Sequence, residues 1–137
     1  MKTHFLPHPS RLTQLKLWGL LLLWLGHPQP EAQLVVTEVM YHPQEQAGEE
    51  DTEKLEFIEL FNAGQKALSL EGLSFVEGVM FDFPTGAQLQ AGAYLIVAKN
   101  AQAIRDHYGI ENVMGNYEGS LDNNGENLRL VNGLGEG

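Results

Sequence analysis

The sequence predicts an all-β fold: an antiparallel β-sandwich with one short helix, lacking its last strands. After residue 33, apolar side chains recur mostly with a period of two, which is typical of strands. Turn signals rich in Gly, Pro and Asn separate these segments about every eight to twelve residues, as in sandwich folds. No strand–helix–strand alternation is visible, which disfavours a parallel α/β sheet, and 137 residues allow one such domain.

The composition of the first 32 residues predicts a secretory signal segment (1–32) in front of a β-sandwich domain (33–137). Three basic residues precede Leu17–Leu25, an uncharged run of nine residues (LWGLLLLWL). A membrane-spanning helix needs about 20 apolar residues and a signal core about 7 to 15, so the length favours export, with cleavage after Ala32. An uncleaved anchor or a buried helix is the alternative. The domain is therefore expected in the periplasm, at the cell surface or outside the cell.

The exported part begins with two strands around an acidic loop. Leu34–Tyr41 is rich in β-branched and apolar residues and stops at His42-Pro43, so it predicts the first strand. Gln44–Lys54 has no large apolar residue and predicts a solvated loop. Leu55–Asn62 carries apolar side chains on both of its faces, which predicts a strand that is covered on both sides.

Further strands follow, separated by short turns. The predicted strands are Leu68–Leu73, Ser74–Phe83, Ala93–Lys99 and Asn127–Val131, with Gly72 and Gly78 marking turns or bulges in the first two. The predicted turns are Pro84–Gly86, Gln90–Gly92 and Asp122–Gly125, the last closing a hairpin. The chain then ends in Gly133–Gly137, a turn-like tail directly after a strand. Because a sandwich usually continues into another strand there, we expect a domain that is truncated at its C-terminus.

One segment has helical periodicity. Asn100 is a favourable N-cap, and Gly109 is placed to end the helix in a left-handed conformation. Between them, Ala101, Ile104 and Tyr108 fall on one face at helical spacing. The sequence therefore predicts one short helix between these two residues.

Six segments follow one another along the exported part: EVMYHP (Glu38–Pro43), EFIELFN (Glu56–Asn62), LSLEGLSF (Leu68–Phe75), FPTGAQLQAGAYLIVAKN (Phe83–Asn100), HYG (His107–Gly109) and GSLDNNGENLRL (Gly119–Leu130). In this order and spacing they make residues 34–131 resemble the lamin tail domain as it occurs in secreted bacterial proteins. The resemblance implies an immunoglobulin-like sandwich used as a non-catalytic module, often beside enzymes or surface proteins in larger chains. Family members usually continue through further strands after the position of Leu130, which again implies a fragment.

Charge and cysteine content exclude several classes of function. The chain has 8 Lys plus Arg, 18 Asp plus Glu and no Cys. Residues 33–137 hold 5 basic and 17 acidic residues, so no general basic surface is left to bind a nucleic acid backbone. The absence of cysteine excludes disulfides, Cys-ligated zinc and thiolate catalysis. We expect no cofactor, no nucleic acid partner and no membrane contact beyond the export signal.

Catalytic motifs are missing from the sequence, so we expect no enzyme activity. The exported part has two histidines, His42 and His107, and no HExxH, GxSxG, Walker or GxGxxG arrangement. His42 precedes Pro43 in a strand-end turn, and His107 falls in the last turn of the predicted helix, where the helix dipole favours a cation. Local structural roles explain both histidines.

Two glutamates of the second predicted strand, Glu56 and Glu59, are three residues apart and point to opposite faces. They therefore form no carboxylate pair. Glu59 shares a face with Phe57 and Phe61, so we expect it near a sheet edge or paired with a cation. Lys99 and Arg129 are the candidate cations, since an unpaired buried carboxylate costs several kcal/mol.

Two acidic segments could bind calcium. The first offers Glu49, Glu50, Asp51 and Glu53, and the second is the turn Asp122–Glu126 (DNNGE). Neither has EF-hand spacing, so a solvated insertion and a hairpin turn are the simpler interpretations. Metal binding is left open.

Aromatic residues divide into two predicted sets. Those at strand spacing are expected in the core: Phe57, Phe61, Phe75, Phe81, Phe83 and Tyr94. Tyr41, Tyr108 and Tyr117 are expected at loop ends, exposed, where a ligand surface would be sought.

The sequence thus predicts an exported, non-catalytic binding or architectural module whose partner is a protein or a surface ligand. One alternative is an N-terminal accessory domain of a larger secreted enzyme, a nuclease or a hydrolase. The other is a calcium-stabilised cell-surface adhesion module.

Overall fold

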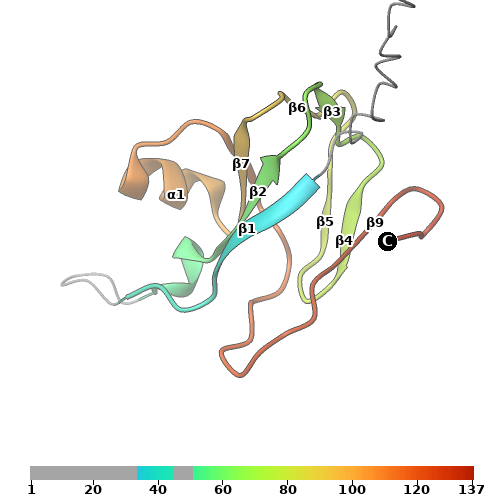
Figure 1. Cartoon of the computed structure of the whole chain (residues 1–137). Helices are drawn as coiled ribbons and strands as arrows, with labels where there is room; N and C mark the ends of the chain where they lie inside the picture. The colour runs from blue at the N-terminus through green and yellow to red at the C-terminus, as the bar shows by residue number, and fades with distance from the viewer. Residues whose placement is uncertain (1–33, 45–50) are drawn as a thin grey trace, which may run out of the picture.

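A computed structural model describes residues 34–44 and 51–137 of the chain (Figure 1). Its main body is a sandwich: one sheet has the strand order β1-β2-β7-β8, and a second has the order β5-β4-β9. A two-stranded ladder, β3-β6, completes the second layer, and the helix α1 lies on the far side of the first sheet (Figure 1). The predicted fold class, a β-sandwich with one short helix, is confirmed. The predicted signal segment 1–32 lies outside the described residues, as do Glu49 and Glu50.

The elements have these bounds along the chain: β1 (Leu34–Met40), the 3-10 turn η1 (Glu53–Leu55), β2 (Phe57–Asn62), β3 (Leu68–Ser69), β4 (Ser74–Glu77), β5 (Phe81–Asp82), β6 (Gln88–Leu89), β7 (Tyr94–Ala98), α1 (Ala101–Tyr108), β8 (Val113–Gly115) and β9 (Arg129–Val131). Most predicted strands are confirmed but shorter. The segment 74–83 forms the β4–β5 hairpin, and the break predicted at Gly78 is a turn, where Gly78 has a φ of +84°.

The predicted helix is confirmed at both ends. The side chain of Asn100 accepts a hydrogen bond from the backbone N–H of Ala103 at 3.0 Å, and Gly109 ends the helix with a φ of +68°. The helix connects β7 to β8, which pair in parallel. The sequence predicted neither β8 nor this strand–helix–strand unit, since VMG is too short to give a periodic signal.

The Asp122–Gly125 turn is confirmed, but the predicted hairpin around it is wrong. The N–H of Gly125 donates to the carbonyl of Asp122 at 3.1 Å. The strand after the turn, β9, pairs with β4, while Glu118 before the turn forms a bridge with Met80. Turn residues fix local backbone geometry and leave the strand partner to the tertiary fold.

Apolar side chains form two clusters, one on each face of the first sheet. The larger cluster lies between the two layers and contains Ile58, Leu60, Leu70, Phe75, Val79, Phe83, Ala87, Leu89, Leu95, Val97, Tyr117 and Leu121. The smaller lies between the first sheet and α1 and contains Leu55, Phe57, Ile96, Ala98, Ala101, Ile104 and Val113. Strand β2 contributes to both clusters, which accounts for its apolar residues on both faces.

Candidate functional site

A buried carboxylate fastens the loop before β9 to the first sheet. Glu56 is 3% exposed, and its Oε2 accepts hydrogen bonds from the hydroxyl of Tyr117 at 3.1 Å and from the backbone N–H of Leu121 at 3.0 Å. Burial, together with the negative charge of Glu56 and the hydrogen bond to it, raises the pKa of Tyr117. The prediction that Tyr117 is an exposed loop-end residue is wrong: it is 4% exposed, because its hydroxyl has a partner 61 residues away.

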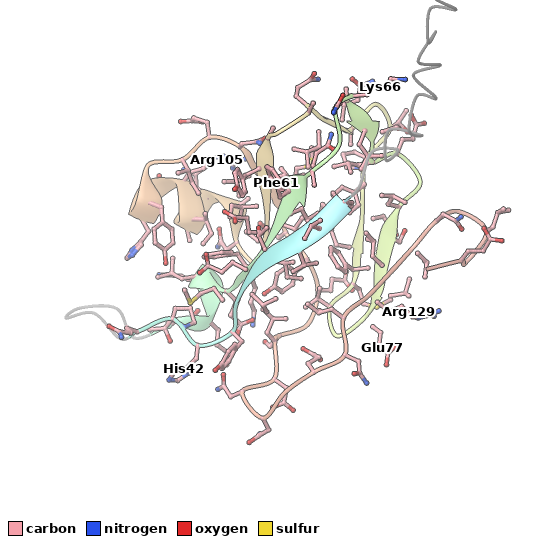
Figure 2. The ribbon with its side chains drawn as sticks, viewed as in Figure 1. His42, Phe61, Lys66, Glu77, Arg105 and Arg129 are labelled. Carbon is pink, nitrogen blue, oxygen red and sulfur yellow. The ribbon has the colours of Figure 1, made fainter. Side chains whose placement is uncertain are left out.

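The prediction that Glu59 pairs with Lys99 or Arg129 is also wrong. The Nζ of Lys99 lies 2.8 Å from Oε2 of Glu53, and it also donates to the hydroxyl of Ser120. The hydrogen bond and the charge of Lys99 lower the pKa of Glu53. Arg129 lies 3.6 Å from Glu77 across the β4–β9 ladder (Figure 2). Lys99 follows β7 and Glu53 lies in η1, whereas Arg129 and Glu77 lie on the paired strands β9 and β4.

Glu59 takes part in a different contact on the face of the sheet. Its Oε1 accepts a hydrogen bond of 2.6 Å from the hydroxyl of Thr37, which lies at an irregularity in β1 where the register with β2 shifts. Glu59 is partly exposed and Thr37 is exposed. The alternative expectation, a position near the sheet edge, describes its surroundings, because β1 is an edge strand of this sheet.

The two histidines stand on different elements. His42 is exposed in the turn after β1 (Figure 2), directly before the buried Pro43. His107 lies in the last turn of α1, with its ring 4.5 Å from that of Tyr108. The chain segment around each is thus as the sequence predicted, a strand-end turn and a helix end.

The acidic turn Asp122–Glu126 uses its carboxylates to close its own backbone. Oδ1 of Asp122 accepts from the backbone and side-chain nitrogens of Asn124, and Oε2 of Glu126 accepts from the N–H of Asp122. Within residues 34–44 and 51–137, no group of three or more His, Cys, Asp or Glu side chains could hold a metal ion. In the same described ranges, no helix has the length and apolar character that crossing a membrane requires.

The predicted core aromatics divide when they are placed in the fold. Phe57, Phe75 and Phe83 are buried as expected, and Phe61 and Phe81 are partly buried. The prediction that Tyr94 lies in the core is wrong, since Tyr94 is 50% exposed. Strand spacing identifies the side chains that share a face and cannot tell whether another layer covers that face.

The exposed Tyr94 belongs to a surface that we name the outer-face patch: Val35, Thr37, Glu38, Glu59, Phe61 and Tyr94. These residues lie on the side of the first sheet that faces away from the second layer. Register places Val35, Phe61 and Tyr94 side by side in one row across β1, β2 and β7. The rings of Phe61 (Figure 2) and Tyr94 stack with centroids 4.5 Å apart and planes 33° apart. The patch is an aromatic row beside two carboxylates.

The helix α1 covers only the other half of this face. It buries Phe57, Ile96 and Val113 beneath Ile104, and Tyr108 meets Phe57 edge to face at 6.1 Å. The helix is eight residues long, or about 12 Å at 1.5 Å per residue. Among the residues that the structure describes, no further element covers the rows of the sheet beyond the helix, and these rows carry the outer-face patch.

A groove lies at the end of β1, where the sequence suggested a ligand surface. Its volume is about 420 Å³, and Val39, Tyr41, Leu121 and Leu128 line it beneath the Asp122–Glu126 turn. Tyr41 is 49% exposed, and Tyr108 is also exposed, as predicted. The groove is the alternative to the outer-face patch as a contact surface.

Comparison with protein-family models matches the Lamin Tail Domain over residues 27–136. The chain belongs to the lamin tail domain family. The match covers every described element of this lamin tail domain and begins within the predicted signal segment. Searches of curated proteins and of solved structures give no match.

The sequence contained one signal for the outer-face patch. Strand β2 of this lamin tail domain places a carboxylate between two aromatic rings on one face, in the alternation Phe57, Glu59, Phe61. A glutamate at such a position needs either a partner on a covered face or access to solvent on an open one. The alternation in β2 is therefore compatible with a face that is open around Glu59.

Proposed function

We propose that this lamin tail domain is an exported, non-catalytic module that binds a partner through its outer-face patch. The observation that carries the proposal is the stacked Phe61–Tyr94 pair, which stays on the surface of a sheet whose neighbouring rows are buried under α1. Exposed apolar clusters rimmed by polar residues mark interaction sites on folded proteins. The proposal applies equally to the domain by itself and to the domain as part of a longer secreted enzyme.

The absence of catalysis is supported by how the ionisable groups are used. Glu56 is committed to Tyr117 and Leu121, and Lys99 to Glu53 and Ser120. These hydrogen bonds hold loops and strands in place. A general base must instead reach a substrate in an open site, so these groups are poor candidates for that role.

Export is supported by the basic residues and the nine-residue apolar run of segment 1–32. The test is to produce the full chain in a bacterial host and measure the mass and location of the product. A shortened chain outside the cytoplasm supports export, and replacing Leu22→Arg in the apolar run should keep the protein inside. A full-length chain that stays in the cytoplasm would overturn this part of the proposal.

Binding is tested by nuclear magnetic resonance on the isotope-labelled full chain. A mixture of small cationic, anionic, aliphatic, aromatic and sugar fragments is added, and the shifted backbone signals are mapped. We expect them to gather on β1, β2 and the start of β7. Tyr94→Ala should remove the response, whereas Tyr41→Ala, which truncates an equally exposed tyrosine in the groove, should not. Shifts that follow Tyr41 would place binding in the groove and overturn the proposal.

A further inference from the structure

We infer that the outer-face patch takes a basic protein segment, with a Lys or Arg side chain seated between Glu38 and Glu59 and apolar atoms resting on Phe61 and Tyr94. This inference rests on the proposed function of the same surface. The proposed function names the binding surface, and the inference adds the chemical class of the partner.

Two carboxylates face each other across the strands of the patch. Register makes Glu38 of β1 the direct partner of Glu59 of β2. The next pair along, Val39 and Ile58, packs into the core between the layers, so alternation places Glu38 on the opposite face, beside Glu59. Like charges in directly opposed positions of an antiparallel pair destabilise the sheet.

The fold orders Glu59 without neutralising it. The hydroxyl of Thr37 donates to Oε1 of Glu59 at 2.6 Å, which holds the carboxylate on the outer face and adds no positive charge. Cations of the surrounding elements are engaged elsewhere: Lys99 on Glu53 and Arg129 on Glu77. Figure 2 places Lys66 beside β3, away from the patch. Within residues 34–44 and 51–137, neither Glu38 nor Glu59 forms an ion pair, so nothing in that part of the chain offsets their repulsion.

A further cation, Arg105, also has a partner of its own. The Nη2 of Arg105 donates to the carbonyl of Val113 at 2.6 Å, at the β8 edge of the sheet, on the side opposite β1. In the sheet Glu59 lies between Glu38 of β1 and Ile96 of β7, and its side chain accepts a hydrogen bond from Thr37. A positive group from another molecule would relieve the repulsion that the domain itself leaves.

The aromatic row favours the same class of partner. Stacked Phe61 and Tyr94 present ring faces that attract a cation, and the methylene stem of Lys or Arg packs well on such rings. Val35 extends the row at the edge strand and offers contact to an apolar neighbour in the segment. An anion would be repelled, and a neutral sugar could stack on the rings and donate hydrogen bonds to the carboxylates but would leave their negative charges uncompensated.

The inference predicts opposite effects on stability and binding. Removing one of the opposed charges by Glu38→Gln should raise the thermal midpoint of the unbound domain, since it removes a repulsion. The same change should weaken binding, since it removes an ion pair. A residue with a purely structural role would not show this combination.

The experiment uses the full chain and a short fluorescent peptide of alternating lysine and valine, followed by anisotropy. Glu38→Gln and Glu59→Gln should each raise the Kd about two- to fivefold, the range expected for a partly exposed ion pair. The matched control is Glu118→Gln, an exposed carboxylate at the bridge with Met80 on the other layer, which should change neither Kd nor thermal midpoint. The same peptide with acetylated lysines should not bind.

Several outcomes would overturn the inference. An equal loss of affinity in Glu118→Gln would mean that the peptide senses the overall charge of the chain. Equal binding of the acetylated peptide, or preferential binding of a neutral oligosaccharide at the patch, would mean that the partner is not a cation. If neutral fragments shift the NMR signals of the patch residues but the lysine peptide does not bind, the inference is wrong and the proposed function is still supported. If no ligand shifts these signals, both are wrong.

Discussion

The hydroxyl of Tyr117 donates to Oε2 of Glu56 at 3.1 Å, joining residues 61 positions apart in the chain. The same oxygen also accepts from the N–H of Leu121, so one carboxylate binds both ends of the segment from Tyr117 to Leu121. The side chain of Glu56 lies where β2 begins, so the contact connects the first sheet to the segment that crosses to β9. A buried charge of this kind is stable only while its hydrogen bonds persist.

Tyr117→Phe is expected to lower the free energy of unfolding by about 1.5–3 kcal/mol, the range for a hydrogen bond to a charged group. The ring remains in the core, so the loss isolates the hydroxyl. Urea denaturation measures it. Tyr108→Phe is the control, since this tyrosine is exposed and should cost about 0.5 kcal/mol or less. An unchanged midpoint in Tyr117→Phe would mean that Glu56 is satisfied without it.

Alkaline stability is expected to depend on Tyr117. Its pKa is raised in the folded state by burial and by the charge of Glu56. Below the ordinary tyrosine pKa of about 10, both states hold the proton and stability does not change. As the pH rises above this value, the unfolded chain loses the proton first, so the free energy of unfolding falls. Urea titrations between about pH 8 and 12 should show a shallower fall in Tyr117→Phe. Parallel curves would contradict the assignment.

Lys99→Met is expected to raise the pKa of Glu53 toward its ordinary value, because the hydrogen bond and the charge of Lys99 lower it. A depressed carboxyl pKa stabilises the fold above the unfolded pKa and loses that effect as the pH falls through the folded pKa. Side-chain carbon resonances of Glu53, followed over an acid titration, measure the change. Lys66→Met removes an equal charge beside β3 and should leave the Glu53 titration where it was.

Gly78→Ala is expected to destabilise the domain more than Gly72→Ala. Both glycines have positive φ, +84° and +78°, so both substitutions carry a backbone cost of about 1–2 kcal/mol. A Cβ on Gly78 would also lie 2.8 Å from Cδ2 of Leu128 and 2.9 Å from the carbonyl of Asn127, whereas one on Gly72 would meet nothing within 4 Å. Crowding should add about 1–3 kcal/mol at Gly78. Equal thermal midpoints for the two variants would show that Leu128 and Asn127 move aside to make room for the Cβ at Gly78.

Asn62→Ala is expected to cost about 3 kcal/mol or more in free energy of unfolding, because it leaves several buried groups without partners. Asn62 is fully buried; its side chain donates to the carbonyls of Lys66 and Leu89 and accepts from the N–H of Gly64. Asn62→Asp keeps the size but loses both donors, so it should also destabilise. In urea denaturation, Asn123→Ala in the exposed turn should have nearly the same free energy of unfolding as the unsubstituted chain. A mild effect of Asn62→Ala would indicate that water replaces the side chain.

Much of the local structure could be predicted because it depends on neighbours in the chain. Asn100 and Gly109 define both ends of α1 through contacts within a few residues. Strands β1, β2 and β7 follow from alternation over consecutive residues. The candidate site was harder, because exposure of Tyr94 and burial of Tyr117 depend on elements far away in sequence.

The sequence by itself determined the β-class, the single helix, the principal strands and the acidic, cysteine-free composition, since these follow from side-chain periodicity, capping and composition. Tertiary structure decided which faces are covered. The short α1 leaves Phe61, Tyr94 and Glu59 open, and the fold sends β9 to β4 rather than to its neighbour in the chain. Burial and strand partners are set by contacts between distant segments, whose free energies compete across the whole domain, and no local pattern records the outcome.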